Sequence, residues 1–253
     1  MTLRMTAPSV IRSLHAAEQP AAMFQIIGLT KRYGEQRALI DVSFDVRPRE
    51  VLGLIGPNGA GKTTLLEAIA GIIAAETGNV HWHGALLPPA HRRNAIFYLP
   101  DGLRPWDDQF AIRVVEFFAS VYGHGQAVAE TIRLVGLAPA LNKRVSALSK
   151  GYGRRLMLAL ALLTPQPVLL MDEPFDGFDL RQTREIMVVI RDVARRGRSL
   201  VLAIHQLVDA ERVCDRFVLL ADGQVRGIGT LKELRARTGK ASARLEDVFL
   251  ALT

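Results

Sequence analysis

The sequence has little cysteine and no long hydrophobic run, and each deficit excludes a class of protein. Its single cysteine, Cys214, has no partner for an intramolecular disulfide and stands among Val213, Phe217 and Val218. We therefore expect a buried thiol in a reducing compartment. The longest uninterrupted apolar stretch, Leu156–Leu163, has eight residues, whereas a membrane-spanning helix needs about 20. A disulfide scaffold is excluded, and the chain is not expected to cross a membrane by itself.

Aromatic residues and lysines are also scarce. Aromatic side chains make up 6% of the 253 residues, and six lysines stand against 26 arginines. The 49% of hydrophobic and 23% of charged residues are typical of a globular protein and exclude a disordered chain. The net charge of +7 suggests anionic partners such as nucleotides, nucleic acid or lipid headgroups. The arginines stand in short groups, such as Arg92-Arg93 and Arg154-Arg155, so we expect most of them on a solvated face.

The N-terminal stretch differs from the rest of the chain. Residues 1–22 contain no acidic residue before Glu18 and no continuous apolar segment, which favours a flexible extension. The alternatives are a transit peptide and a translation start at Met5 or Met23. Residues 23–253 are expected to form the folded domain.

Apolar patterning within this domain predicts strands first, and strands alternating with helices later. The first strands are predicted at Phe24–Leu29, Ile40–Val46 and Val51–Ile55. The later elements are strands at Pro167–Met171, Leu200–Ile204 and Phe217–Ala221, with helices at Leu180–Ala194 and Leu207–Val213 between them. Since strands that alternate with helices form parallel sheets, the predicted fold class is α/β with a parallel sheet.

Three further regions have helical spacing of their apolar residues. A helix is predicted over Leu65–Ile73, with Gly71 weakening its last turn. Residues from about 101 to 150 indicate a mostly helical insertion. Residues from about 230 to 253 indicate a C-terminal helical tail.

A phosphate-binding loop is predicted between the buried strand and the first helix. Residues 56–63 match the pattern G-x-x-x-x-G-K-[ST], in which glycines let backbone N–H groups close around phosphate oxygens. We expect Lys62 to reach the β- and γ-phosphates and the Thr63 hydroxyl to hold Mg²⁺. The candidate nucleotide contacts are Gly56, Pro57, Asn58, Gly59, Ala60, Gly61, Lys62, Thr63 and Thr64. An ordinary glycine-rich turn is the weaker alternative.

Two acidic residues follow a second apolar strand. Val168–Met171 leads directly into Asp172 and Glu173, at the strand end where ligands of open α/β sheets bind. Asp172 is expected to hold Mg²⁺ and Glu173 to polarise an attacking water. The alternative is a strand followed by a solvated turn, which the nearby phosphate loop disfavours.

The order of these two motifs and five others resembles that of the ATP-binding cassette (ABC) ATPases. Residues Leu148–Tyr152 read Leu-Ser-Lys-Gly-Tyr and resemble the signature motif of that family. The other matches are the aromatic-loop residue Tyr33, the Q-loop Tyr98–Asp101, the D-loop Gly177–Asp179 and the switch histidine His205. The resemblance runs from Phe24 to Thr253. It implies a P-loop NTPase core with a parallel sheet, an antiparallel β subdomain and an inserted helical subdomain.

The resemblance also implies roles for these residues. Tyr33 would stack on adenine, although a lone tyrosine is more often a packing residue. Ser149 and the amide of Gly151 would bind the γ-phosphate held by another subunit, which implies a head-to-tail homodimer or a paired ABC ATPase. The alternative for Ser149 is an ordinary helix N-cap. His205 would sense the γ-phosphate or hold the attacking water in place, and a buried structural histidine is its alternative.

Some positions depart from the family pattern. Lys150 replaces a signature glycine and Tyr152 replaces the glutamine, but both changes spare the two expected phosphate contacts. Asp101 stands where the family usually has a glutamine that touches Mg²⁺, so we expect Asp101 to bind the metal directly or through water. The alternative is that Asp101-Gly102 only starts a turn. The acidic replacement and the closing segment Leu245–Leu250 resemble those of exporter-type subfamilies.

The resulting functional hypothesis is the ATPase subunit of an exporter, with ATP and Mg²⁺ as cofactors. It implies a separate transmembrane permease subunit as partner, a peripheral location on the cytoplasmic face of the inner or plasma membrane, and no nucleic acid. The alternative is a soluble cassette ATPase that acts on ribosomes or DNA. Ribosome-associated members of the family resemble two cassettes fused in one chain, and DNA-repair members carry long coiled-coil or zinc insertions. Neither feature appears in this sequence. A regulator without turnover is disfavoured by Glu173 and His205.

Aromatic residues near the Q-loop position suggest where a partner could dock. Trp106, Phe110 and Phe117 are predicted to form a groove for a helix of the permease subunit. Core packing is the alternative, and for Phe117 it is the favoured interpretation.

Overall fold

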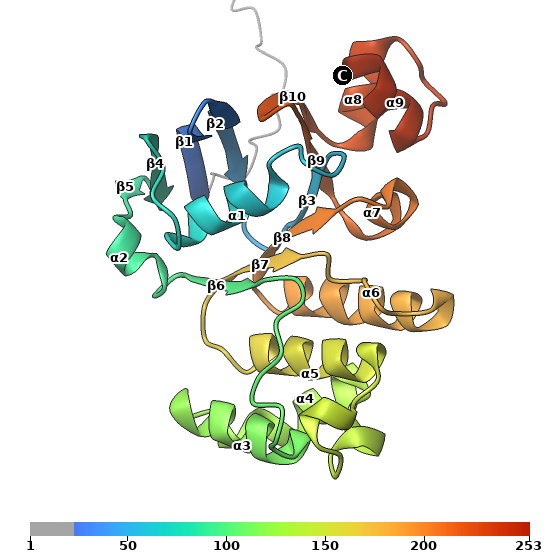
Figure 1. Ribbon diagram of the computed structural model, residues 1–253. Coiled ribbons are helices and arrows are strands. Elements are labelled where there is room, and N and C mark those ends of the chain that lie inside the picture. The colour runs from blue at the N-terminus through green and yellow to red at the C-terminus, as the bar shows by residue number, and fades with distance from the viewer. Residues whose placement is uncertain (1–22) are drawn as a thin grey trace, which may run out of the picture.

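The computed structural model describes residues 23–253, which form two β-sheets with helices packed against them (Figure 1). The extension expected over residues 1–22 lies outside the described residues. Within residues 23–253, no helix is long and apolar enough to span a bilayer.

The larger sheet has six strands in the order β10-β9-β3-β8-β7-β6. Its members are β3 (Val51–Ile55), β6 (Ile96–Leu99), β7 (Val168–Asp172), β8 (Ser199–Ile204), β9 (Arg216–Ala221) and β10 (Gln224–Gly229). All neighbours pair in parallel except β10, which is antiparallel to β9. Every residue of β3, β7, β8 and β9 is buried, as expected for strands covered on both faces. The predicted parallel sheet is confirmed.

The smaller sheet is antiparallel, with the order β2-β1-β4-β5. Its strands are β1 (Phe24–Tyr33), β2 (Gln36–Val46), β4 (Thr77–Trp82) and β5 (Ala85–Leu86). Strands β1 and β2 are longer than predicted because their polar ends also pair, Arg32 with Arg37 and Tyr33 with Gln36. Apolar alternation marks only the buried part of such a hairpin, so it misses these ends.

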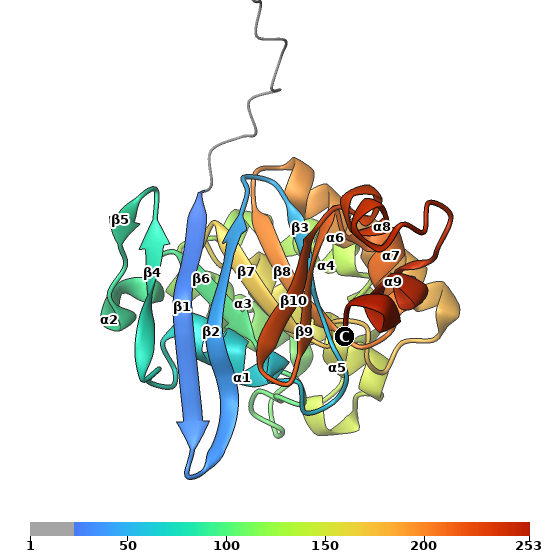
Figure 2. The ribbon, with the colours of Figure 1, turned by 90° about the horizontal axis from the view of Figure 1, so that it is seen from above.

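The first helix packs between the two sheets (Figure 2). Leu65 and Ile69 of α1 (Lys62–Ala70) share a core with alternate residues of β3, Leu52 and Leu54. This helix begins and ends three residues earlier than predicted. Gly71 adopts a left-handed conformation, φ +79°, and its amide binds carbonyls of the last turn, which ends the helix.

The opposite face of the large sheet is covered by helices. Residues Val51 and Ile55 of β3 belong to this second core, together with α5 (Lys150–Leu162) and α6 (Leu180–Arg195). The remaining helices are α2 (Pro89–Arg92), α3 (Ala111–Val121), α4 (Val128–Val135), α7 (Leu207–Val213), α8 (Leu231–Thr238) and α9 (Leu245–Leu252), with short 3₁₀ turns at Gly125–Ala127, Ala138–Ala140 and Val145–Ala147. Figure 1 shows α3 and α4 beyond α5, at the end of the molecule away from the small sheet.

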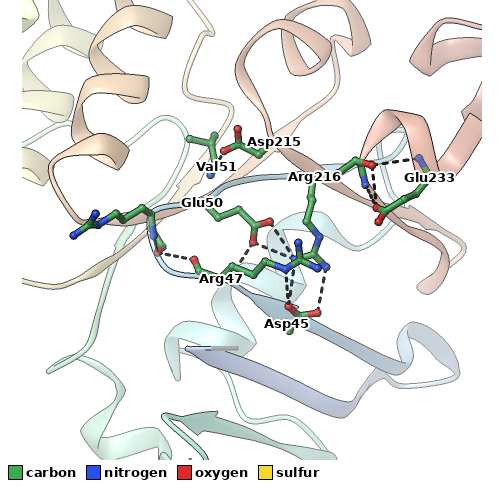
Figure 3. A network of polar contacts seen from close by, with 10 residues as sticks. Asp45, Arg47, Glu50, Val51, Asp215, Arg216 and Glu233 are labelled. Carbon is green, nitrogen blue, oxygen red and sulfur yellow. Dashed lines mark hydrogen bonds and ion pairs between the residues drawn. The ribbon is translucent and has the colours of Figure 1, made fainter. Parts of the chain in front are cut away.

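A cluster of charged side chains connects the two sheets (Figure 3). Arg216, the first residue of β9, donates to both carboxylate oxygens of Asp45 in β2 at 3.2 Å and to Glu50 at 3.1 Å. Burial raises the pKa of Glu50, while its bond from the Arg47 amide and its pairing with Arg216 oppose that rise. A second contact between the sheets lies at the turn between β9 and β10, where the carbonyl of Gly223 accepts a hydrogen bond from the amide of Ile40 in β2 at 2.8 Å.

Candidate functional site

The phosphate loop lies between the end of β3 and the start of α1. Gly61 has φ +100°, and a Cβ atom there would lie 2.5 Å from the carbonyl oxygen of Ala38, so only glycine fits. Lys62 Nζ donates to the carbonyl oxygens of Gly56 at 2.8 Å and Pro57 at 3.2 Å, so the side chain folds back over the loop. Burial lowers the pKa of Lys62, although Glu173 and Asp172 partly oppose the shift. The ammonium is therefore a poorly solvated cation placed where a phosphate would bind.

Thr63 and Asp172 bring two oxygen ligands together. Thr63 Oγ1 donates to Asp172 Oδ2 at 2.6 Å, joining the first turn of α1 to the end of β7. Asp172 is 4% exposed, and burial raises the pKa of its carboxyl. No cluster of three or more His, Cys, Asp or Glu side chains suited to a metal occurs in residues 23–253. One hydroxyl and one carboxylate fit Mg²⁺, which is usually held by few protein ligands plus substrate phosphates.

Glu173 and His205 meet at the adjoining strand ends. Glu173 Oε2 lies 2.7 Å from His205 Nδ1, and the Glu173 amide donates to the carbonyl of Ala203 at 3.0 Å. Glu173 has φ +45°, an unusual conformation for a residue other than glycine. Such backbone strain costs about 1–3 kcal/mol and is typical of functional sites. The pair is suited to holding and deprotonating a water molecule.

The open cleft beside these groups contains most of the predicted nucleotide contacts. The predicted residues that line it are Tyr33, Asn58, Gly59, Gly61, Lys62, Thr63, Thr64, Asp101, Asp172 and Glu173. Tyr33 is 50% exposed, and Lys31 Nζ lies 5.2 Å from the centre of its ring. An exposed ring at the mouth of the cleft is available for stacking. The predicted contact Ala60 is buried and does not line the cleft, and its amide donates to the carbonyl of Pro57 at 3.2 Å.

Ser149 and Gly151 lie outside this cleft. Ser149 is the N-cap of α5, with Oγ accepting from the Tyr152 amide at 3.4 Å, so the predicted capping role is present. Lys150 Nζ pairs with Asp176 Oδ2 at 2.8 Å, which joins the start of α5 to the segment after Glu173. Within one chain, the signature residues and the phosphate loop therefore face different spaces.

Sequence reasoning missed Arg154 as a site residue. Its guanidinium donates to Asp101 Oδ1 at 3.1 Å, to the carbonyl of Asp172 at 2.8 Å and to the carbonyl of Glu173. The solvated-face prediction is wrong for Arg154 and for its neighbour Arg155, each of which is only 8% exposed. Two arginines inside an otherwise apolar helix were the available signal. Metal binding by Asp101 stays a prediction, and the Asp101–Gly102 turn is also present.

Two of the three residues predicted to form an aromatic groove, Trp106 and Phe117, line a hollow at the surface, whereas Phe110 is exposed beside Arg144 and does not line it. Trp106 is 52% and Phe117 53% exposed, and their rings meet edge to face with centroids 5.4 Å apart. Gln109, Arg113 and Val114 line the same hollow. The preference for core packing of Phe117 was wrong, because α3 buries Val114 and Val115 and turns Phe117 outward.

Comparison with known proteins gives consistent matches. Residues 39–176 match the sequence profile of a family described as ABC transporter. The chain is 31% identical over 240 residues to the ABC-type transporter ATP-binding protein EcsA of Bacillus subtilis (strain 168), covering 92% of this chain and 97% of EcsA. It is 34% identical over 215 residues to the Nod factor export ATP-binding protein I of Paraburkholderia xenovorans (strain LB400), covering 81% and 70%. A solved structure of the ATP-binding subunit of an ABC transporter superimposes with a TM-score of 0.82 at 30% identity, covering 91% of this chain and 99% of that one.

Proposed function

Because this chain belongs to the ABC transporter family and is an ABC ATPase, we propose that it uses ATP hydrolysis to power a separate transmembrane permease subunit of an exporter. One observation carries the catalytic part of the proposal. The Thr63–Asp172 pair and the Glu173–His205 pair lie at the same edge of the large sheet, and Thr63, Asp172 and Glu173 line one cleft with the phosphate loop. Ligands of open α/β sheets bind at this edge.

Each group in the cleft has a part in the reaction. Lys62 moves from the loop carbonyls to the β- and γ-phosphates of ATP. Its hydrogen bonds to two neutral carbonyl oxygens are then replaced by stronger bonds to charged phosphate oxygens. Thr63 and Asp172 hold Mg²⁺, which neutralises phosphate charge when bound. Glu173 accepts a proton from the water that attacks the γ-phosphorus, and His205 orients Glu173. Tyr33 stacks on the adenine.

The complete site needs a second copy or a paired ABC ATPase. Ser149 and Gly151 start α5 but do not line the cleft of their own chain. The positive end of a helix is a favourable place for an anion. In a head-to-tail dimer these residues would contact the γ-phosphate held by the other subunit, so ATP would close the dimer and hydrolysis would reopen it.

The groove at Trp106 and Phe117 is the proposed contact with the permease. It lies on α3 and the preceding loop, a few residues after Asp101. Exposed aromatic surface of this kind is typical of docking sites for an apolar helix. The subunit would then be peripheral, on the cytoplasmic face of the inner or plasma membrane. The export direction is supported by the name of the Nod factor export relative.

The test has two measurements. The purified chain should release phosphate from ATP only when Mg²⁺ is present, and a tagged chain should be recovered with cell membranes when its permease is coexpressed. Absence of Mg²⁺-dependent hydrolysis would overturn the ATPase mechanism. Hydrolysis with no membrane recovery under coexpression would overturn the permease partnership and favour a soluble ABC ATPase.

A further inference from the structure

Arg154 connects three parts of the site through one side chain. We propose that Arg154 is a positioning residue for ATP hydrolysis, which holds the backbone of Asp172 and Glu173 and uses Asp101 as its counter-ion. The inference rests on the proposed function, because it concerns the same reaction. It gives Asp101 a role as the partner of Arg154 in place of a role as a metal ligand.

The Arg154 guanidinium is a buried cation, and burying a cation costs free energy. Arg154 lies in the first turns of α5 and is 8% exposed, so its guanidinium has lost most of its contact with water. A buried charge is tolerated where hydrogen bonds and an opposite charge replace water. The two main-chain carbonyls supply the hydrogen bonds, and the Asp101 carboxylate at 3.1 Å supplies the charge.

Glu173 has a backbone conformation that its neighbours must hold in place. Its positive φ is unfavourable for a side chain with a Cβ atom and persists only where the surroundings fix it. The Glu173 amide is held by the carbonyl of Ala203, and its carbonyl is held by Arg154. Arg154 also binds the carbonyl of Asp172, so it fixes both peptide groups from which the catalytic carboxylate projects. A small rotation of either peptide would move that carboxylate away from the attacking water.

Asp101 is the acidic partner of Arg154. Its side chain is half-exposed and lines the nucleotide cleft, yet its Oδ1 atom is already occupied by Arg154. An aspartate standing alone there would add negative charge beside Asp172, whose carboxyl already has a raised pKa. Pairing with Arg154 neutralises that charge. A neutral side chain at position 101 would leave the arginine without its counter-ion.

The same helix provides a matched control. Arg155 is equally buried, donates to the carbonyl of Val135 at 2.6 Å and pairs with Glu185 at 2.9 Å. It has the same chemistry as Arg154, but its partners lie in α4 and α6, away from the cleft. Comparing Arg154→Gln with Arg155→Gln therefore separates the loss of a buried ion pair from the loss of positioning.

The experiment measures kcat, KM for ATP, the Mg²⁺ concentration for half-maximal rate, Tm, and calorimetric affinity for Mg²⁺-ATP. Arg154→Gln should lower kcat about 10- to 100-fold, a typical effect of misplacing a catalytic group by about 1 Å. Its KM and its affinity for Mg²⁺-ATP should stay within about twofold of the unmodified protein, since the phosphate loop is untouched. Both glutamine variants should lower Tm by similar amounts, because each removes a buried ion pair. Arg155→Gln should nevertheless change kcat by less than about twofold.

A double-mutant cycle tests the role of Asp101. Asp101→Asn should lower kcat in the unmodified protein but have no further effect in Arg154→Gln, because partners in one ion pair are not additive. A raised Mg²⁺ requirement in both backgrounds would show that Asp101 is a metal ligand and would overturn its role as counter-ion. Equal kcat in Arg154→Gln and Arg155→Gln would overturn the positioning role.

Two further results keep the test decisive. If Arg154→Gln does not fold, Arg154→Lys keeps the charge but lacks the planar fork, and its kcat should be lower than that of the unmodified protein. Unchanged kcat in Arg154→Lys and in Asp101→Asn would overturn the inference. If the unmodified chain has no Mg²⁺-dependent ATPase activity, the proposed function fails instead.

Discussion

Nδ1 of His205 lies 2.7 Å from Oε2 of Glu173, at the ends of two neighbouring parallel strands. The two strands are in register, with Asp172 paired with Ala203, so the residues that follow each strand are brought side by side. This arrangement comes from strand pairing and does not depend on a flexible loop. The histidine can therefore hold the carboxylate in one orientation before the nucleotide binds.

Glu173→Gln should bind ATP and hydrolyse it about 10² to 10⁴ times more slowly, because an amide cannot accept the proton of the attacking water. The closed dimer should accumulate and elute earlier in gel filtration with ATP and Mg²⁺. Full activity would remove Glu173 from the chemistry. A variant that stays monomeric under these conditions would contradict the two-site dimer.

Lys62→Ala should weaken ATP binding about 10- to 100-fold, since a charge-assisted contact to phosphate contributes about 1.5–3 kcal/mol. Isothermal titration calorimetry with Mg²⁺-ATP measures this directly. Lys232→Ala, an exposed change in α8, is the control and should bind like the unmodified protein. Equal affinities for both variants would show that Lys62 does not bind phosphate.

Asp172→Asn should raise the stability of the nucleotide-free protein at neutral pH. Burial raises the pKa of Asp172, so the folded chain loses this proton at a higher pH than the unfolded chain does. The ionised carboxylate therefore opposes folding above the raised pKa, and this penalty disappears as the pH falls below the unfolded pKa of about 4. Asparagine avoids the penalty and can still accept the bond from Thr63.

Thermal unfolding between pH 8 and pH 5 tests whether the ionised Asp172 carboxylate destabilises the folded protein. The Tm advantage of Asp172→Asn should be largest at the high end and shrink as the pH falls. Asp222→Asn removes the charge of a side chain that is 91% exposed, and it should change Tm little at any pH. A Tm advantage that grows toward low pH would contradict the assignment.

Trp106→Ala should leave basal ATPase activity unchanged and reduce recovery with membranes that contain the permease. A tryptophan at the centre of an interface commonly contributes about 2 kcal/mol or more, which corresponds to roughly 30-fold weaker association. Ile72→Ala removes another exposed apolar side chain, just after α1, and is the control. A Trp106→Ala protein that fails to fold, or that keeps full membrane recovery, would contradict the docking role.

Elements that are buried along their whole length could be predicted from the sequence. The apolar run of β3, followed by the glycine pattern and Lys62, indicates both the buried strand and the loop. The polar pairs at the tip of the β1–β2 hairpin could not be predicted, because backbone pairing holds them with little apolar burial. Phe117 was misassigned for a related reason, since a helix of mostly apolar residues does not show which face is covered.

Within the site, motifs with fixed spacing were predictable and single side-chain contacts were not. The Thr63–Asp172 contact joins residues 109 positions apart. It was still predictable, because the phosphate-loop motif and the acidic residues after β7 were each expected to hold Mg²⁺. The partners of Arg154 lie 18, 19 and 53 positions away and belong to no pattern that spacing reveals. Scattered arginines are usually solvated, so only the packing of α5 against the strand ends identifies this one as buried.

The charged cluster around Arg216 determines where this molecule can bend. Asp45 belongs to the small sheet and Arg216 to the large one, and their bidentate contact closes the junction between them (Figure 3). Pulling the sheets apart would break the contact between Asp45 and Arg216 and leave the buried arginine with Glu50 alone of its two carboxylate partners, which is unfavourable. The two sheets should therefore move as one rigid body. A movement started by ATP at the strand ends could then reach Trp106 through the connections of α3, α4 and α5 with the large sheet.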